Sequence, residues 1–370
     1  MTAKKMKIGI VGCGNISQIY LTNGKTFNDI EVVACADINM PAAQAKATEH
    51  NIKAMTVDEL LKSPEIDMVI NLTIPKAHAE INIKALNAGK HVHCEKPLAI
   101  SLEDGRKIID LAKKKGLKVG CAPDTFLGAG LQTCRKIIDD GWIGKPFAGS
   151  AVMMGRGPEG WHPNPFFFYE KGGGPMFDMG PYYMTALVHL LGPVKSVCAY
   201  TKATFPERIA GCKEHFGKKI KVEIPTHYSG SLEFHNGAIV SVMISFDVFR
   251  HGHSPIEIYG SEGSLMVPDP NGFGGPVKIF RPGAENWTDS VLTHKYAKNS
   301  RIIGAADIAC AVKSGRPHRA SGDLAYHVLE IMHSFELSSK ARKHIELKSK
   351  CAQPAPLPTD LMEGMLDTQV

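Results

Sequence analysis

The first 122 residues alternate short apolar runs with helical patterns, and this alternation constrains the fold more than any other feature of the chain. The apolar runs cover residues 6–11, 31–36, 67–72, 91–94 and 117–121. Helical patterns lie at residues 15–26, 41–50, 57–62, 77–88 and 102–115. Because strands that are apolar throughout are buried on both faces, the alternation predicts a parallel sheet covered by helices on either side.

The rhythm changes after about residue 123. Helical patterns recur at 130–140, 178–191, 303–314 and 322–341. Extended segments follow one another at 146–154, 194–204, 226–235, 238–249, 255–260 and 276–281. Strands that succeed each other without helices between them favour antiparallel pairing. We therefore predict an α/β Rossmann-like domain over residues 1–122, an α+β domain with a mostly antiparallel sheet over 123–350, and a proline-containing C-terminal arm over 351–370.

Composition excludes several classes of protein. The 43 Lys and Arg residues exceed the 37 Asp and Glu residues only slightly and are scattered, so no nucleic-acid partner is expected. No apolar run reaches the ~18 residues that a membrane helix needs, so no membrane association is expected. The nine cysteines form no CxxC pair, which argues against a disulfide framework or zinc site and favours the cytoplasm. The His91/His93 and His251/His253 pairs lack neighbouring ligands, so we expect no metal.

A glycine turn follows the first apolar run and opens a helix. Its residues are Gly12, Gly14, Asn15 and Ile16, and Ser17 takes the third small position of the pattern. In this context, the first glycine permits a tight turn and the second lets the backbone approach a pyrophosphate. Asp37 ends the second run, where an acid accepts hydrogen bonds from ribose hydroxyls and repels a 2′-phosphate. We therefore predict NAD rather than NADP as the cofactor, against the alternative of an ordinary strand–helix turn with an unrelated acid.

Two further polar segments follow the third and fourth runs. The first contains Thr73, Pro75 and His78, and the second contains Glu95 and Lys96. Ligands of open α/β sheets bind beyond the carboxyl ends of the strands, so both segments are expected to lie beside the glycine turn and to contact the cofactor. Lys96 is then placed to meet a substrate hydroxyl. The alternative is a surface lysine in a strand-end turn.

The chain resembles the glucose–fructose oxidoreductase, inositol dehydrogenase and rhizopine-catabolism (Gfo/Idh/MocA) family over nearly its whole length. The motifs occur in the family's order: Gly12-Cys-Gly14, Thr73-Ile-Pro75 with His78, Ala88-Gly-Lys-His-Val with Glu95-Lys96-Pro97, Gly172-Gly-Gly174 with Asp178-Met-Gly180, Ile258-Tyr-Gly-Ser-Glu-Gly-Ser-Leu265, and Gly315-Arg-Pro-His-Arg-Ala-Ser321. The resemblance implies a large open sheet in the second domain. One face of that sheet commonly supports homo-oligomers (dimers, tetramers or higher), and its other side holds a sugar-like substrate near the domain junction.

Catalytic residues carry over from the family one by one. Lys96 occupies the lysine of the Glu-Lys-Pro motif, and Asp178 occupies the aspartate of the Asp-x-Gly motif. Tyr182 stands where many members have a histidine base, a substitution that some active members share. We therefore expect Lys96, Asp178 and Tyr182 to be catalytic, and Tyr182 to contact the substrate as well. His189 lies two helical turns beyond Tyr182 and is a candidate substrate ligand, with helix-end packing as the alternative.

The remaining candidates are substrate ligands from loops. Asp124 stands where the family often has the arginine of an Asn-x-Arg stretch, which favours a neutral substrate; capping of a helix is the alternative. The ring-rich segment 160–169 contains His162 and predicts either a sugar-stacking wall or a packing loop. Arg156 precedes that segment. His251 and His253 are weaker candidates.

These expectations define one function. The chain is predicted to be an NAD-dependent oxidoreductase that transfers a hydride to or from a secondary alcohol carbon of a sugar, cyclitol or glycoside. Oxidation of C3 in a glucosyl group is the sharper prediction. Beside the positively charged nicotinamide ring and partly desolvated, Lys96 is expected to have a lowered pKa, which would bring proton transfer near neutral pH. The alternatives are a reductase of a non-sugar carbonyl and a non-catalytic, NAD-dependent sugar sensor.

Overall fold

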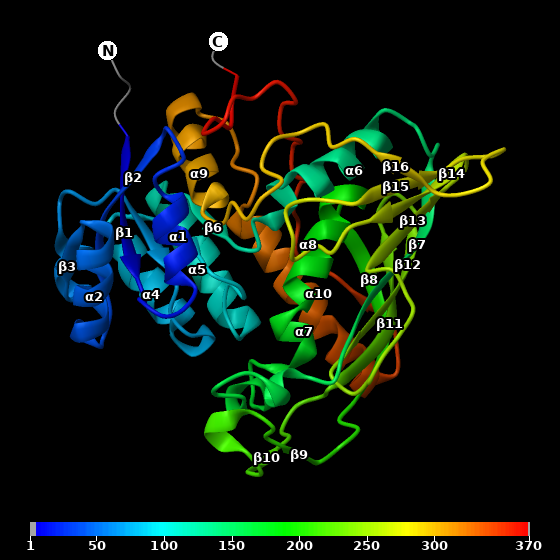
Figure 1. Cartoon of the computed structure of the whole chain (residues 1–370), viewed down its shortest axis with the longest axis horizontal. Coiled ribbons are helices and arrows are strands. Elements are labelled where there is room, and N and C mark those ends of the chain that lie inside the picture. The colour runs from blue at the N-terminus through cyan, green and yellow to red at the C-terminus, as the bar shows by residue number, and fades with distance from the viewer. Residues whose placement is uncertain (1–4, 369–370) are drawn as a thin grey trace.

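A computed structural model describes residues 5–368 and contains two large sheets, one in each domain (Figure 1). The first four and last two residues of the predicted domains lie outside the described residues. The first sheet has the order β3-β2-β1-β4-β5-β6, and all its pairs are parallel. Its strands are β1 (Met6–Val11), β2 (Ile30–Ala36), β3 (Lys53–Met55), β4 (Met68–Asn71), β5 (His91–Cys94) and β6 (Val119–Cys121). The predicted parallel sheet is confirmed, although the sequence pattern did not predict the short strand β3.

Helices connect these strands, and local sequence explains several of their ends. They are α1 (Ser17–Asn23), α2 (Met40–His50), α3 (Val57–Lys62), α4 (Pro75–Asn87) and α5 (Leu102–Lys115). Thr56 and Glu59 form a capping box that starts α3. Ser101 caps the start of α5, and Gly116 ends that helix with φ +66°, a left-handed conformation that glycine adopts without strain.

The second sheet is mixed and mostly antiparallel, with the order β16-β15-β14-β13-β7-β12-β11-β8-β17. Only β7 and β12 pair in parallel. Its strands are β7 (Pro146–Met154), β8 (Val194–Lys202), β11 (His227–Phe234), β12 (Ile239–Ser245), β13 (Ile256–Gly260), β14 (Gly263–Val267), β15 (Val277–Phe280), β16 (Thr288–Ser290) and β17 (Ile345–Glu346). A separate hairpin pairs β9 (Glu207–Ile209) with β10 (Lys219–Lys221). This arrangement confirms the predicted mostly antiparallel sheet of the second domain.

Helices cover one face of the second sheet. They are α6 (Ala129–Asp139), α7 (Gly174–Asp178), α8 (Gly180–Leu191) and α10 (Gly322–Ala341). The covered face carries alternate apolar residues such as Val240, Val242 and Ile244, which are buried. The opposite face carries Ser231, Ser241 and Ser150, which lie opposite one another on β11, β12 and β7. Exposed apolar side chains, Ile239 and Tyr200, lie on the same face, so this face is mixed in polarity whereas the covered face is apolar.

Helix α9 (Ile303–Ser314) follows β16 of the second sheet in sequence but packs against the first domain (Figure 1). Lys313 pairs with Asp29, and the side chain of Asn23 donates to the carbonyls of Asn299 and Arg301. The predicted boundary near residue 122 separates the two sheets, whereas the packing of α9 joins a later segment to the first domain. This return of the chain brings residues near 300 beside α1.

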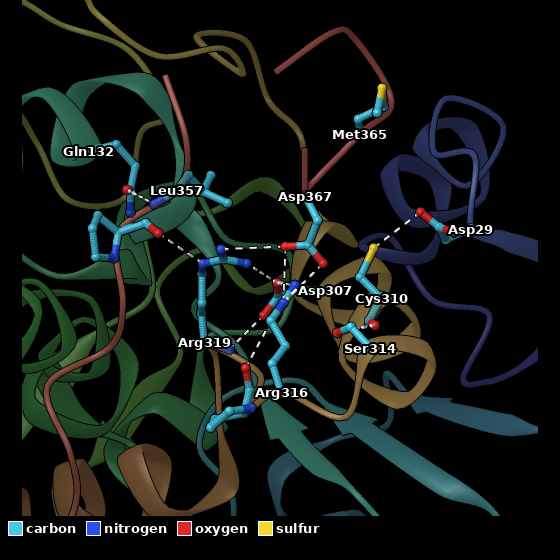
Figure 2. A network of polar contacts seen from close by, with 12 residues as sticks. Asp29, Gln132, Asp307, Cys310, Ser314, Arg316, Arg319, Leu357, Met365 and Asp367 are labelled. Carbon is cyan, nitrogen blue, oxygen red and sulfur yellow. Dashed lines mark hydrogen bonds and ion pairs between the residues drawn. The ribbon is translucent and has the colours of Figure 1, made fainter. Parts of the chain in front are cut away.

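The C-terminal arm is ordered by buried leucines and by polar contacts (Figure 2). Leu357, Leu361 and Leu366 are buried. Arg316 and Arg319 both contact Asp307 and Asp367, so the end of the arm is tied to α9 and to the loop that follows it. The arm is thus a packed part of the fold. In the part of the chain that the structure describes, no helix has the length and apolar character needed to cross a membrane.

Candidate active site

A cleft of about 310 Å³ lies at the carboxyl edge of the parallel sheet, between the two domains. The first domain supplies loops that follow β1, β4 and β5, with Ile16, Thr73, Pro75, Glu95 and Lys96 among the lining residues. The second domain supplies the ring-rich segment and the α7–α8 region, with Phe167, Phe168, Gly173, Asp178 and Tyr182. This is the edge where ligands of open α/β sheets bind.

The glycine turn has the geometry that its sequence predicts. Gly12 has φ +104°, and a Cβ there would come within 2.6 Å of the backbone of Leu72, so no other residue fits. Gly14 has open space on its Cβ side, and Gly14, Asn15 and Ile16 are exposed beside the cleft. The Ser17 hydroxyl donates to the Gly14 carbonyl at 2.6 Å. The turn is therefore rigid and leaves room for a phosphate to approach the backbone.

Asp37 lies next to this turn at the end of β2. One carboxylate oxygen accepts from the Cys13 amide at 2.8 Å, and the other accepts from the Asn39 amide at 2.8 Å. Ile38 beside it is 99% exposed, and no cation adjoins Asp37 in sequence. The glycine turn and this acid together fit the diphosphate and the adenosine ribose of a dinucleotide.

His78 does not face the cleft, because its ring is fully buried. Nδ1 lies 2.6 Å from the Pro97 carbonyl and Nε2 lies 2.9 Å from the Thr73 carbonyl. Burial lowers the pKa of His78, but Cys94 and the two carbonyls raise it more, to about 9. A doubly protonated ring then donates at both nitrogens. The predicted direct contact with a cofactor is corrected: His78 fastens the Thr73 and Pro97 loops that line the cleft.

Lys96 and Asp178 join the two domains at the cleft. The Lys96 ammonium donates to the Asp178 carboxylate at 2.8 Å and to the Asp178 carbonyl at 2.6 Å. Lys96 Nζ also lies 5.3 Å from the centre of the Tyr182 ring. The side chains of Lys96 and Asp178 are 17% and 28% exposed, so the pair is sheltered yet reachable from the cleft. The structure brings together the three residues predicted to be catalytic.

The lowered pKa of Lys96 beside a nicotinamide ring stays a prediction, and the protein groups around Lys96 act in the opposite direction. Burial lowers the pKa of Lys96, but the charge of Asp178 and those of Tyr182 and Glu95 raise it further, so the net direction is upward. Glu95 in turn accepts from the Tyr20 hydroxyl at 2.8 Å and from the Lys96 amide at 2.9 Å. Lys96 is therefore a charged donor in this structure.

Asp124 and His189 are both buried, which does not fit their predicted contact with substrate. Asp124 is 1% exposed and accepts from the amides of Ile302 and Gly304 at 3.1 and 3.0 Å, at the start of α9. The alternative of helix capping describes it better, though the helix is distant in sequence. His189 packs against Phe126 at a ring distance of 5.1 Å, inside a helix that is buried all round. Both residues support the fold beneath the cleft.

His162 and Arg156 lie behind or beyond the wall of the cleft. The His162 ring packs edge-on against Phe168 at 4.9 Å and Phe167 at 5.5 Å, and those two phenylalanines line the cleft. The Arg156 guanidinium stacks between Phe205 and Phe249 at 4.9 and 4.3 Å. His162 thus supports the wall, whereas Arg156 is held by rings outside the cleft.

Sequence reasoning missed Arg301 and Tyr20. The pKa of Arg301 is lowered by burial but raised further by the charge of Tyr182 and by a side-chain hydrogen bond to it, with smaller effects of Asp124 and Tyr20. Tyr20 holds Glu95 through its hydroxyl. No signal for Arg301 exists in its local sequence. An interior helical residue such as Tyr20 gives no indication of a functional contact either.

Comparison with known proteins places the chain in one family. Residues 6–122 match the family model described as "Oxidoreductase family, NAD-binding Rossmann fold", and residues 131–266 match the GFO/IDH/MocA C-terminal domain. The chain therefore belongs to the Gfo/Idh/MocA family of oxidoreductases, as its motifs predicted, and its first domain is the NAD-binding one.

Individual relatives differ in how much they share with the chain. A D-glucoside 3-dehydrogenase of Escherichia coli is 30% identical over 66% of this chain and 72% of its own length. A myo-inositol 2-dehydrogenase of Thermotoga maritima is 23% identical over 93% of this chain and 99% of its own. The structure of a levoglucosan dehydrogenase in complex with NADH and L-sorbose covers 94% of this chain and 100% of its own, with a TM-score of 0.80 and 21% identity, which shows a shared fold.

Proposed function

We propose that the chain oxidises a secondary alcohol carbon of a neutral sugar, cyclitol or glycoside with NAD, and that C3 of a glucosyl group is the reacting carbon. The observation that carries the proposal is the Lys96–Asp178 pair. Its atoms lie 2.8 Å apart across the domain junction, in a cleft that also borders the glycine turn. The relatives that act on a glucoside and on myo-inositol support the substrate class.

The side chains of the cleft suggest how the alcohol is held. An ammonium group has three N–H donors, and Lys96 uses two on Asp178, so one is left for the substrate oxygen. Asp178 fixes the direction of that donor. Bound NAD would take up the hydride from the alcohol carbon, and the phenolate form of Tyr182 would take up the alcohol proton. Burial raises the pKa of Tyr182 and the charge of Lys96 lowers it, so loss of the Tyr182 proton precedes this transfer. Positioned acid–base groups of this kind contribute ~10²–10⁴-fold to a rate.

The second wall of the cleft favours a neutral ring substrate. Phe167, Phe168 and Phe177 line it and present apolar ring surface. Aromatic faces pack against the apolar side of a substrate, while Lys96 and Asp178 bind its hydroxyls. Phe167 is 40% exposed, so it is available to such a ligand. We therefore favour pyranosides and cyclitols over open-chain acids.

The test is reduction of NAD with a panel of monosaccharides, inositols and methyl, aryl and C-linked glucosides, in single-turnover and steady-state conditions. Turnover of one polyol class supports the proposal. Among methyl glucosides, the 3-deoxy compound should be inert while the 2-deoxy and 4-deoxy compounds react. If the 3-deoxy compound reacts as well, the C3 assignment is wrong. Silence across the panel with NAD binding intact would favour a non-sugar carbonyl reductase or a sugar sensor.

We also propose NAD over NADP as the cofactor. The Asp37 carboxylate at the end of β2 would repel a ribose 2′-phosphate, and Ile38 and Asn39 supply no compensating cation. Wild-type protein should therefore bind NAD more tightly than NADP in calorimetry. Asp37→Ser should narrow that preference by about tenfold, which corresponds to loss of one modest interaction. An unchanged preference would show that Asp37 does not select the cofactor.

Two further proposals concern the whole molecule. We propose a homo-oligomer that assembles through the open face of the second sheet, where Ser150, Ser241 and Ser231 form a row across β7, β12 and β11. Ser241→Arg should lower the mass found by sedimentation; an unchanged mass would contradict this interface.

We propose a cytoplasmic location, because all nine cysteines are unpaired. The test is to label this protein in intact cells and to determine the compartment in which it lies. A location outside the cytoplasm would contradict the proposal.

A further inference from the structure

Glu95 is a carboxylate at the cleft whose hydrogen-bond donors are both neutral. Its side chain is half-buried and lines the cleft next to Lys96. One carboxylate oxygen accepts from the Tyr20 hydroxyl at 2.8 Å, and the other accepts from the Lys96 backbone amide at 2.9 Å. None of the ion pairs within residues 5–368 includes Glu95. The negative charge of Glu95 is therefore not matched by a bonded cation of the protein.

Two cations of the site bind other partners. The Lys96 ammonium donates to the Asp178 carboxylate at 2.8 Å, so these two charges match each other. The Arg301 guanidinium donates to the Asn271 side chain at 2.8 Å. A sheltered carboxylate without an ion-pair partner is costly, and a positively charged ligand relieves that cost. The charge of Glu95 is therefore available to a cation that enters the cleft.

The position of Glu95 is fixed from two sides. Its backbone amide donates at 2.8 Å to the carbonyl of Asn71, the last residue of β4. Its carboxylate is held by Tyr20, which lies in α1, the helix that the glycine turn opens, and whose side chain is fully buried. Because a buried ring has little freedom, the Tyr20 hydroxyl fixes the direction of the carboxylate. The helix at the predicted diphosphate site is thus joined to the residue next to Lys96.

The chemistry of hydride transfer indicates which cation Glu95 meets. The nicotinamide ring has to lie against the alcohol carbon whose oxygen binds Lys96, and Glu95 lines the same cleft beside Lys96. The ring is positively charged in oxidised NAD and neutral in NADH. An anion beside the ring therefore attracts the oxidised form by its charge and has no such attraction for the reduced form.

We propose that Glu95 makes the cleft select oxidised NAD over NADH, and that Tyr20 is a positioning residue that holds Glu95 for this task. The inference rests on the proposed function, because it takes NAD as the group that receives the hydride. Glu95 favours binding of the oxidised cofactor and, after the hydride has removed the positive charge, favours release of the reduced one. The chain is thereby biased toward oxidation of its substrate, a direction that the fold alone does not determine.

The experiment measures the dissociation constants of oxidised NAD and of NADH by calorimetry on the full chain, without substrate. The quantity compared is the Kd of NADH divided by the Kd of oxidised NAD. Glu95→Gln removes the charge and keeps the shape, so this ratio should fall about tenfold, as for the loss of one charge interaction in a sheltered site. Tyr20→Phe keeps the charge but frees the carboxylate, so the ratio should fall about threefold. The matched control is Glu65→Gln, in an exposed pair with Lys53, which should leave the ratio unchanged.

The ratio separates a charge effect from a merely structural one. A variant that only loosens the loop weakens both forms of the cofactor equally, so a wild-type ratio in Glu95→Gln overturns the inference. If Glu95→Gln fails to fold, Tyr20→Phe decides in its place, and an unchanged ratio there overturns the positioning role of Tyr20 in either case. These measurements need no substrate. A wild type that binds NAD but oxidises no polyol would therefore contradict the proposed function, whereas an unchanged ratio would contradict the role of Glu95.

Discussion

The Lys96–Asp178 pair at the domain junction and the cluster around Arg208 in the second domain are both sheltered ion pairs, yet their hydrogen bonding differs. Arg208 is 2% exposed and donates to Glu159, Asp247 and the carbonyls of Phe246 and Arg156. Thr226 donates to the same Asp247 at 2.7 Å. All the partners of this cluster are therefore internal. Lys96, in contrast, keeps one N–H free beside a cleft.

This difference teaches that burial and pairing alone do not mark a catalytic charge. A saturated cluster resists change because removing any member leaves a buried charge unpaired. A pair with unused hydrogen-bonding capacity at a cleft can exchange one partner for a ligand. We therefore expect substitutions at Lys96–Asp178 to lower turnover and substitutions in the Arg208 cluster to lower the free energy of unfolding.

The largest effect is expected from Lys96→Met. Turnover of the preferred polyol should fall by ~10²–10⁴-fold, because the positioned donor beside the reacting oxygen is lost. Binding of NAD by calorimetry should remain within a few-fold. The matched control is Lys76→Met, an exposed lysine that pairs with Glu170 on the other side of the cleft. If Lys96→Met keeps its turnover, Lys96 takes no part in the chemistry and the expected difference in role between the two ion pairs is wrong.

Arg208→Met should do the reverse. It leaves the buried carboxylates of Glu159 and Asp247 without a counter-ion, so the free energy of unfolding should fall by about 3–5 kcal/mol. Urea denaturation measures this loss, and kcat of the folded fraction should change little. Lys219→Met, at an exposed pair with Glu207 on the same hairpin, is the control. A large loss of kcat without destabilisation would show that this cluster also shapes the active site.

The ion pairs that tie Asp367 of the C-terminal arm to Arg316 and Arg319 combine an exposed and a buried carboxylate (Figure 2). Asp367 is 32% exposed and binds Arg316 with two distances of 3.0 Å, whereas its neighbour Asp307 is fully buried. Asp367→Asn should therefore cost only about 1 kcal/mol, since Asp307 continues to pair both arginines. Thermal unfolding of the full chain measures it. If Asp367→Asn lowers the free energy of unfolding as much as Arg208→Met does, solvent exposure does not determine how much each ion pair contributes to stability.

The sequence predicted the site residues of the first domain better than those of the second domain. Gly12, Asp37 and Lys96 follow β1, β2 and β5, and the carboxyl edge of a parallel sheet brings such positions to the same side of the domain. Lys96, Asp178 and Tyr182 meet across the junction as the family resemblance implied. Asp124 and His189 were misplaced because each has a polar side chain next to a functional segment, and only the packing shows that both point inward.

Arg301 could not have been predicted from the sequence. Its placement depends on a backbone conformation of Ile302 that the identity of the residue disfavours, and on a carboxylate 178 residues earlier in the chain. Local propensity describes neither contact. The acid at position 124 and the cation at position 301 are thus explained together only by the tertiary structure.

Asp124 should also make the free energy of unfolding depend on pH. Near neutral pH this is the smallest of the expected effects. Burial raises the pKa of Asp124, and although the Gly304 amide and the charge of Arg301 lower it, the value stays at about 6. The folded chain then binds this proton more tightly than the unfolded chain, whose carboxyl keeps a pKa near ~3.9. The contribution of Asp124 to stability should therefore rise as the pH falls from about 6 to about 4, unlike that of a carboxylate whose pKa is lowered by folding.

Other acids titrate in the same range, so the quantity to measure is the difference in unfolding free energy between wild type and Asp124→Asn. Because the amide in this variant does not titrate, the difference should shift in favour of the wild type on going from about pH 7 to about pH 4, by at most ~2 kcal/mol. Asp360→Asn, at an exposed position in the arm, should show no such change. If the difference moves the opposite way, the Asp124 carboxylate is stabilised by its two amide donors and by Arg301 more than burial opposes it. Asp124 would then belong with the saturated charges of the Arg208 cluster.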